Sequence, residues 1–210
     1  GSTLEEIAAV KGGIVKPGRP AVLQAQGEAV AAVIRGIAQE KQAPFLYCAD
    51  WPPSAVALSA RGARFTAGFP GLPAQEYEIR LPGAHQVDNA VTALAALSLL
   101  PEDLRVSPEA ARAGLREAVW PGRLEWRGNL LLDGAHNPQG VRALREYAQD
   151  FLRDRRVAVL TGSMADKDVA AIAEGIAAIA DAVVCVSPEH MARAVPAPEL
   201  CGLYRGRTDK

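Results

Sequence analysis

The stretch Asn129-Leu-Leu-Leu-Asp-Gly-Ala-His-Asn-Pro138 decides the fold class of the second half of this 210-residue chain. Its apolar run predicts a strand, and the polar residues after the run predict a loop that enters a helix near residue 141. Two further apolar runs, Val157–Thr161 and Ala182–Val186, follow this strand, and helical patterns of about a dozen residues separate the runs. Strands that alternate with crossover helices of this length are typically parallel, so the sequence predicts an α/β domain.

The first half of the chain has a different pattern. Thr3 followed by Glu6 predicts a capped helix near the beginning of the sequence, and residues 55–82 alternate apolar and polar positions as a β-hairpin does. The change to alternating strand and helix patterns after about residue 120 predicts two domains, residues 1–119 and residues 120–210. The other elements expected in the first half are strands at 21–24 and 45–48 and helices at 28–41, at 87–99 and after Ser107.

Composition and charge exclude several classes of protein. Lys and Arg number 23 against 24 Asp and Glu, so the chain lacks the overall basic charge of a nucleic-acid-binding protein. An apolar run of about 18 residues is absent, as is the basic-then-apolar pattern of a signal sequence, so no membrane partner is expected. Cys48, Cys185 and Cys201 form neither a disulfide framework nor a metal-binding pattern, and this favours a reducing, cytoplasmic location.

Polar side chains follow the predicted strands of the second half. In parallel α/β sheets, ligands bind outside the carboxyl ends of the strands. The first strand ends at Asp133, with His136 and Asn137 close behind, and the second strand is followed by Asp166 and Lys167. These groups suit a polar, anionic or nucleotide ligand. A G-x-G-x-x-G fingerprint, a G-x-S-x-G elbow and metal-type His/Cys spacing are absent, so the residues alone leave the chemistry open.

Five motifs occur between residues 3 and 168, and their order carries further information. They are Thr3–Gly18, Leu81-Pro-Gly-Ala-His-Gln-Val-Asp-Asn-Ala90, Pro121-Gly-Arg-Leu-Glu125, Leu132-Asp-Gly-Ala-His-Asn-Pro138 and Gly162-Ser-Met-Ala-Asp-Lys-Asp168. In this order they resemble the folylpolyglutamate synthase/dihydrofolate synthase family of the Mur ligase superfamily. The resemblance implies an α/β protein in which residues 1–119 are the remainder of a P-loop-type central ATPase domain. Residues 120–210 would then form a Rossmann-like C-terminal domain of the Mur ligase type.

The resemblance also implies a reaction. Enzymes of this family are ATP-dependent amide ligases that phosphorylate a carboxylate of dihydropteroate or folate. The amine of L-glutamate then attacks the acyl phosphate, and phosphate leaves. ATP and Mg²⁺ are therefore the expected cofactors, since the metal holds phosphate oxygens and spreads their charge. The expected partners are these small molecules, with no nucleic acid and no membrane, and the complete enzyme is expected to be a cytoplasmic monomer.

The family's nucleotide and metal residues can be carried over by position. Lys11 matches a lysine that reacts with CO2, and the resulting carbamate is an oxygen ligand suited to Mg²⁺. Here Val10 and Gly12 replace the usual Glu and Ala, and the alternative is a solvated lysine at a helix end. Gln86 and Asn89 match positions that read the adenine edge, because amides donate and accept hydrogen bonds at once. A helix-capping role is the alternative for these two residues.

The remaining candidates come from the second half of the chain. Arg123 matches an arginine that contacts ATP phosphates, where a guanidinium fork suits charged oxygens. Asp133 matches a carboxylate on the nucleotide side, and His136 a residue near the reacting phosphate and the incoming amino acid. Asn137 is expected to shape the turn. The matches at Asp166 and Lys167 fit either the site or stabilisation of their loop, while His85 and His190 are expected to be structural or superficial.

One family feature is missing from the sequence. A phosphate-cradling G-x-x-x-x-G-K-[ST] loop is absent, so the resemblance implies an internal or C-terminal piece that does not catalyse ligation alone. Two alternatives remain open at this stage. The first is a cell-wall Mur-type ligase, although such ligases typically carry Asp-Tyr-Ala-His where this chain has Asp-Gly-Ala-His. The second is a non-catalytic module that binds a nucleotide or folate.

Overall fold

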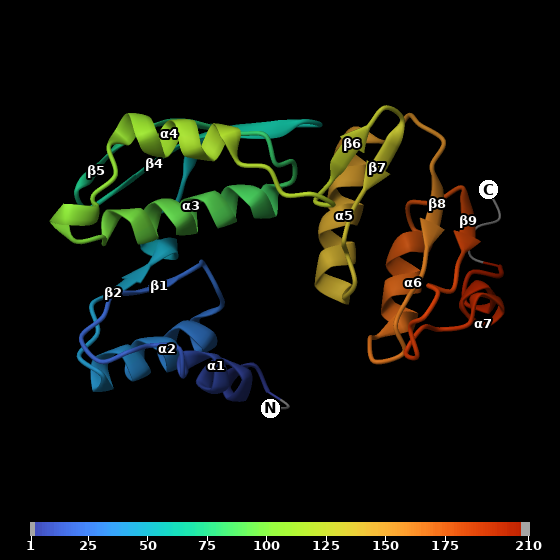
Figure 1. Ribbon diagram of the computed structural model, residues 1–210, viewed down its shortest axis with the longest axis horizontal. Coiled ribbons are helices and arrows are strands. Elements are labelled where there is room, and N and C mark those ends of the chain that lie inside the picture. The colour runs from blue at the N-terminus through green and yellow to red at the C-terminus, as the bar shows by residue number, and fades with distance from the viewer. Residues whose placement is uncertain (1–2, 207–210) are drawn as a thin grey trace. The chain divides into compact units, whose positions relative to one another are not determined.

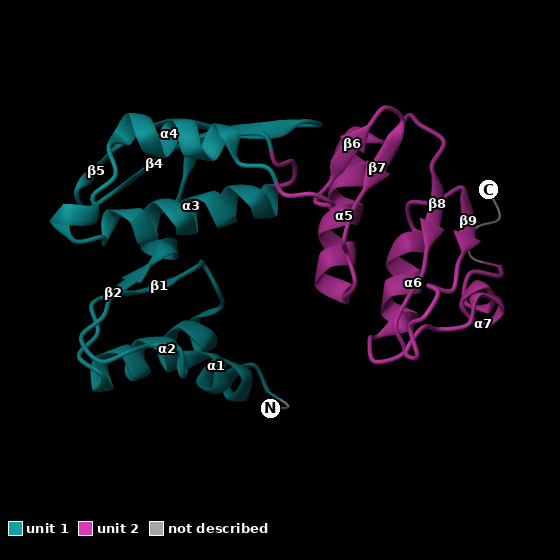
Figure 2. Cartoon of the chain, in the orientation of Figure 1, with its two compact units in different colours: residues 1–80, 84–119 teal, residues 81–83, 120–210 magenta. Residues whose placement is uncertain are grey.

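The computed structural model describes residues 3–206 and divides into two compact units (Figures 1 and 2). Unit 1 consists of residues 1–80 and 84–119, and unit 2 of residues 81–83 and 120–210. Each unit has its own hydrophobic clusters and its own strands. The two units are therefore described separately below.

Unit 1 begins with two helices and a pair of parallel strands. Helix α1 (Leu4–Gly12) is capped by Thr3, whose hydroxyl accepts a hydrogen bond from the Glu6 amide at 3.2 Å, as the sequence predicts. Helix α2 (Glu28–Glu40) buries one apolar face, which includes Ile34. The strands are β1 (Ala21–Leu23) and β2 (Phe45–Tyr47), which pair in parallel.

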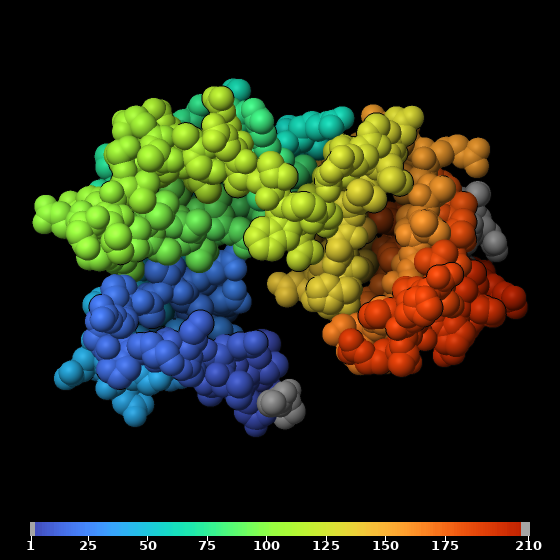
Figure 3. Space-filling model, viewed as in Figure 1, coloured from blue at the N-terminus to red at the C-terminus, as the bar shows by residue number. Residues whose placement is uncertain are grey.

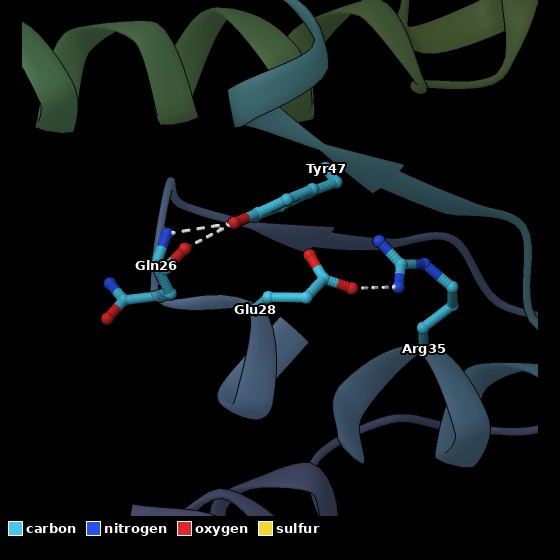
Figure 4. A network of polar contacts seen from close by, with 4 residues as sticks. All are labelled: Gln26, Glu28, Arg35 and Tyr47. Atoms are coloured by element: carbon cyan, nitrogen blue, oxygen red, sulfur yellow. Dashed lines mark hydrogen bonds and ion pairs between the residues drawn. The ribbon is translucent and has the colours of Figure 1, made fainter. Parts of the chain in front are cut away.

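Tyr47 ties the end of β2 to the loop after β1 (Figure 4). Its hydroxyl donates to the carbonyl oxygen of Gln26 and accepts from the Gln26 amide at 3.3 Å. On the adjoining helix α2, Arg35 pairs with Glu28 at 2.9 Å, and both side chains are exposed. The two hydrogen bonds of the tyrosine hold the loop 24–27, and the exposed ion pair beside it adds little in water.

The larger part of unit 1 is an antiparallel sheet covered by two helices. A 3-10 turn (Cys48–Asp50) precedes strands β3 (Ser54–Ser59), β4 (Gly62–Phe69) and β5 (Leu72–Ile79), which are ordered β3-β4-β5. Helix α3 (Ala84–Ser98), a second 3-10 turn (Glu102–Leu104) and helix α4 (Pro108–Glu117) follow. In the space-filling view α3 and α4 form one continuous surface (green in Figure 3).

The larger core cluster of unit 1 lies between this sheet and α3, and a smaller one lies beside α2. Alternate residues of β4 and β5 face inward, and Phe65 and Tyr77 stack with ring centroids 5.8 Å apart. Gly62 has φ +153°, and a Cβ there would lie 2.0 Å from the Ile79 carbonyl oxygen, so only glycine fits this hairpin. Residues of α3 that complete the core are Val87, Ala90, Val91, Leu94 and Ala95.

Unit 2 contains two separate strand pairs. Strands β6 (Glu125–Arg127) and β7 (Leu130–Leu132) form an antiparallel hairpin that precedes helix α5 (Pro138–Phe151). Strand β8 (Ala158–Thr161) pairs in parallel with β9 (Ala182–Cys185) across helix α6 (Val169–Ala177). Helix α7 (Ala197–Gly202) follows β9.

The prediction of three parallel strands in unit 2 is therefore only partly right. The parallel arrangement holds for β8 and β9, but the run at 130–132 pairs antiparallel with a short strand that the sequence analysis missed. Gly128, with φ +60°, allows the tight turn between β6 and β7. A short apolar run does not identify the strand with which it pairs, and here it pairs with the neighbouring strand in a local hairpin.

Two clusters form the core of unit 2. In the first, Val141 of α5 packs with Ile172 and Ile176 of α6 and with Leu200 of α7. In the second, Leu124, Tyr147, Ala148 and Leu152 are buried together, and the Trp126 indole donates to the Tyr147 hydroxyl at 2.8 Å. These clusters hold the helices against the inner faces of the strands.

The helices of both units are short. The longest described helix, α3, has 15 residues and buries one face. Across residues 3–206 the structure contains no helix with the length and apolarity needed to span a bilayer.

Candidate functional site

Four polar side chains of unit 1 form a hydrogen-bonded chain, which we call the amide relay. It consists of Gln24, directly after β1, and of His85, Gln86 and Asn89 in the first turns of α3. Gln24 Nε2 donates to Asn89 Oδ1 at 3.5 Å, and Asn89 Nδ2 donates to Gln86 Oε1 at 3.1 Å. Gln86 Nε2 lies 3.1 Å from His85 Nε2. The structure therefore brings together the two residues expected to read adenine, Gln86 and Asn89, and adds Gln24, which the sequence analysis missed.

Packing holds both strands of the parallel pair against α3. Val22 of β1 packs against the cluster that includes Val87 and Val91. Next to β2, Cys48 Sγ contacts Thr92 Oγ1 at 3.9 Å, and burial raises the pKa of that thiol. Burial also raises the pKa of Asp88, although the nearby His85 opposes the shift. The relay thus lies at the carboxyl end of parallel strands, where α/β folds bind ligands.

Lys11 lies in the last turn of α1, and its side chain is exposed. A cation is favourable there because the helix dipole is negative at its C-terminus. The next residue, Gly12, is buried against α2, where a Cβ would lie 2.3 Å from Ile37 Cδ1. Among the described residues no group of three His, Cys, Asp or Glu side chains could hold a metal ion. A carbamate on Lys11 would provide an oxygen ligand of the kind that Mg²⁺ accepts.

In unit 2, Asp133 organises the loop that follows β7, which we call the strand-end loop (residues 133–137). Its Oδ1 accepts from the Ala135 amide at 2.8 Å, and its Oδ2 accepts from the Leu124 amide at 3.0 Å. The Gly134 amide donates to the Gly122 carbonyl oxygen at 2.7 Å. Both carboxylate oxygens therefore already fold the chain, and any ligand of Asp133 would share them.

His136 lies on the strand-end loop, and Arg123 lies in the turn before β6, which is hydrogen-bonded to that loop. A Cβ built at Gly134 would be 2.9 Å from Arg123 Nη1, so the missing side chain leaves room for the guanidinium group. His136 is exposed, and its Nδ1 lies 2.8 Å from the Gly134 carbonyl oxygen. A carbonyl oxygen can only accept, so Nδ1 carries the proton and Nε2 of the neutral ring keeps a lone pair. Arg123 and His136 can therefore present a cation and a base from two neighbouring segments, the turn before β6 and the strand-end loop after β7.

Asn137 begins helix α5. Its Oδ1 accepts from the Gly140 amide at 2.7 Å, and Pro138 occupies the first turn, where a missing N–H costs nothing. The side chain of Asn137 thus shapes the turn between the strand-end loop and the helix.

Asp166 and Lys167 lie in a second loop of unit 2, after β8. Asp166 Oδ2 is 2.9 Å from Arg193 Nη1 and 3.3 Å from Lys167 Nζ. The Lys167 hydrogen bond and the charges of Arg193 and Lys167 hold the pKa of Asp166 below its usual range. The Ala165 amide donates to the Arg193 carbonyl oxygen at 2.8 Å, so this loop is tied to residues 193–195. No sequence signal pointed to Arg193.

The candidate residues fall into three groups. Unit 1 carries Lys11 together with the relay residues Gln86 and Asn89. Unit 2 carries the group around the strand-end loop (Arg123, Asp133, His136 and Asn137) and the separate pair Asp166 and Lys167. One feature of the sequence could have identified Gln24: it is a polar residue immediately after a strand.

Similarity to known proteins covers both units. Residues 122–208 match the family model of the Mur ligase glutamate ligase domain. The dihydrofolate synthase/folylpolyglutamate synthase of Bacillus subtilis is 34% identical over 87% of this chain and 44% of its own length. The folylpolyglutamate synthase of Lacticaseibacillus casei is 30% identical over 99% of this chain and 50% of its own length.

Solved structures are also similar to both units of this chain. The Mycobacterium tuberculosis folylpolyglutamate synthase complexed with ADP superposes with a TM-score of 0.84 at 25% identity, over 99% of this chain and 48% of that one. Escherichia coli FolC in complex with DHPP and ADP superposes with a TM-score of 0.77 at 27% identity, over 96% of this chain and 46% of that one. The chain therefore spans about half the length of the relatives that it matches.

Proposed function

We propose that this chain belongs to the folylpolyglutamate synthase/dihydrofolate synthase family and supplies part of an ATP-dependent glutamate ligase. The substrates are L-glutamate and dihydropteroate, a reduced folate, or both. The observation that carries the proposal is that similarity to these enzymes extends over both units rather than over the glutamate ligase domain alone. It favours a folate ligase over a cell-wall ligase, because the similar proteins described above are folate enzymes.

The proposed reaction has two steps. A carboxylate oxygen of the pteroate or folate takes the γ-phosphoryl group of ATP, which gives an acyl phosphate and ADP. The amine of glutamate then attacks the acyl carbon, an amide bond forms, and phosphate leaves. Mg²⁺, when bound, neutralises phosphate charge during phosphoryl transfer. We assign residues 1–119 to the central ATP-binding domain and residues 120–210 to the C-terminal domain.

In unit 1 the proposed task is nucleotide and metal binding. Gln86 and Asn89 contact the edge of the adenine ring, because their amides offer donors and acceptors whose positions the relay fixes. Lys11, as its carbamate, provides an oxygen ligand for Mg²⁺. Its exposure in the last turn of α1 leaves the amine open to CO2.

In unit 2 the proposed task is charge stabilisation and proton transfer. The Arg123 guanidinium group binds phosphate oxygens of ATP through its planar fork. In its neutral form the His136 ring, with Nδ1–H on the Gly134 carbonyl oxygen, keeps a lone pair on Nε2 that can take a proton from the glutamate ammonium group before the amine attacks. Asp133 and Asn137 hold this loop in shape, and by its family position Asp133 is assigned to the nucleotide side. Asp166 and Lys167 remain secondary candidates, since their ion pairs with each other and with Arg193 stabilise their own loop.

A fusion protein tests the proposal. The part of the Bacillus subtilis relative that this chain does not match would be joined to residues 1–210, and phosphate release would be measured with ATP, Mg²⁺, glutamate and dihydropteroate. We expect glutamate-dependent turnover from the fusion. The 210-residue chain alone and the relative's segment alone are expected to show only background release. A soluble fusion that is inactive on pteroate and folate substrates, or active only on UDP-muramyl substrates, would contradict the proposal.

A further inference from the structure

The side chain of Gln24 carries an acceptor that no described residue uses. Gln24 is partly buried directly after β1, and its Nε2 donates to Asn89 Oδ1 at 3.5 Å. Its own Oε1 receives no hydrogen bond from any residue within 3–206. A carbonyl oxygen in this position can accept a hydrogen bond from a ligand.

The amide relay has one direction, and this fixes the orientation of Gln24. Gln24 Nε2 donates to Asn89 Oδ1, and the nitrogen of that same Asn89 amide donates to Gln86 Oε1. The last donor, Gln86 Nε2, reaches His85 Nε2, which accepts when that nitrogen is unprotonated. Turning the Gln24 amide over would bring its oxygen against Asn89 Oδ1, so two acceptors would face each other.

Packing keeps this end of the relay in place. Val22, two residues before Gln24, packs against the core cluster that contains Val87 and Val91 of α3. Gln86 is only 7% exposed, so its amide has little freedom to rearrange. The open acceptor of Gln24 is therefore linked through Asn89 to the buried amide of Gln86.

We propose that Gln24 determines which purine base is accepted: its Oε1 takes a hydrogen bond from the 6-amino group of adenine and rejects bases with a 6-oxo group. This inference rests on the proposed function, which places the base beside Gln86 and Asn89. A 6-oxo group is an acceptor and would face the Gln24 oxygen, which cannot turn without breaking the relay. Sites that pair a polar group of the ligand reject analogues that leave it unpaired.

The test is an NMR titration of the ¹⁵N-labelled 210-residue chain with ADP and with IDP, which has a 6-oxo group. The side-chain amide signals of Gln86 and Asn89 report binding into the millimolar range. Wild type is expected to bind ADP at least about tenfold more tightly than IDP. Gln24→Leu is expected to reduce this preference to within about threefold, mainly by weakening ADP.

Two variants serve as comparisons. Gln26→Leu is the matched control, because Gln26 bonds Tyr47 only through its backbone, and it is expected to keep the wild-type preference. Gln24→Glu loses the donor to Asn89 but presents an acceptor oxygen to the base in either orientation, so it is also expected to prefer ADP. Loss of the preference in Gln24→Glu as well as in Gln24→Leu would overturn the acceptor role.

The outcomes separate this inference from the function on which it rests. If wild type binds neither nucleotide, the proposed nucleotide site fails and the inference fails with it. If wild type prefers ADP and a folded Gln24→Leu keeps the same preference, the nucleotide site stands and the role of Gln24 is overturned. Backbone spectra that match wild type outside residues 24, 86 and 89 establish that the variant is folded.

Discussion

The amide relay of unit 1 and the strand-end loop of unit 2 are both polar, but they are held together differently. In the relay, side chains bond to side chains, from Gln24 through Asn89 to Gln86. In the strand-end loop, side chains bond to the backbone, as Asp133 does with the amides of Leu124 and Ala135. The relay can therefore lose a member while the backbone keeps its path, whereas the loop depends on its carboxylate for its shape. A polar motif after a strand thus mixes ligand-binding groups with groups that fold the loop.

The largest effect on stability is expected from Asp133→Ala. The change leaves the Leu124 and Ala135 amides without their acceptor, and hydrogen bonds to a charged group contribute about 1.5–3 kcal/mol each. We expect unit 2 to lose about 3 kcal/mol of unfolding free energy, measured by urea unfolding. Asp133→Asn keeps one acceptor and is expected to lose about half as much. A loss below about 0.5 kcal/mol in Asp133→Ala would show that the carboxylate does not hold the loop.

Asn137→Ala sharpens the comparison at the other end of the loop. The change removes the N-cap of α5, where the side chain accepts from the Gly140 amide at 2.7 Å. N-cap losses cost about 1 kcal/mol, and we expect that decrease in urea unfolding of unit 2. Asp168→Ala, which removes the cap of α6, is the matched variant and is expected to cost a similar amount. An unchanged unfolding midpoint in Asn137→Ala would contradict this role.

Asn89→Ala is expected to have a smaller effect, within about 0.5 kcal/mol on the unfolding of unit 1. Asn89 is exposed, so water that replaces its side chain can reach the groups that it leaves on Gln24 and on the buried Gln86. The measurement is urea unfolding followed by the NMR signals of unit 1. A cost as large as that of Asp133→Ala would remove the distinction between the relay and the strand-end loop.

The smallest effect is expected from the ion pairs of Asp166, and it depends on pH. The Lys167 hydrogen bond and the Arg193 charge lower the pKa of Asp166 from its ordinary value of 3.8. A lowered pKa means that the contribution is complete above the ordinary value and is lost as the pH falls through the folded value. The urea midpoint of Asp166→Asn should therefore lie slightly below wild type at neutral pH.

Acid and salt provide the controls for this prediction. The gap between Asp166→Asn and wild type is expected to close in acid, and also in high salt, because the pair is exposed and screened. A gap that persists at low pH would mean that the Asp166 charge is not its cause.

Local patterns predicted much of the fold from the sequence. The Thr3 cap, the helix after Ser107 and the parallel pairing of β8 with β9 each depend on neighbouring residues or on a crossover helix, and all three are confirmed. The antiparallel pairing of β7 was missed, because its partner strand is only three residues long and an apolar run does not identify its neighbour.

The candidate site was predictable to a different degree. The family motifs named Gln86, Asn89, Asp133 and His136, but they carry no information on which oxygen bonds to which amide. Gln24 and Arg193 join their clusters through contacts between residues 65 and 27 positions apart. Such contacts form only when the chain is folded, so no local sequence pattern predicts them.

The most direct test of the account compares two variants of the fusion enzyme in steady-state assays of glutamate-dependent phosphate release. Because the relay is assigned to nucleotide binding, Asn89→Ala is expected to raise KM for ATP at least about tenfold while kcat stays within about threefold. Because the His136 ring is assigned to proton transfer, His136→Ala is expected to lower kcat by about a hundredfold or more with little change in KM for ATP. If both variants shift the same parameter, or if neither shifts any, the division of labour between the two clusters is contradicted.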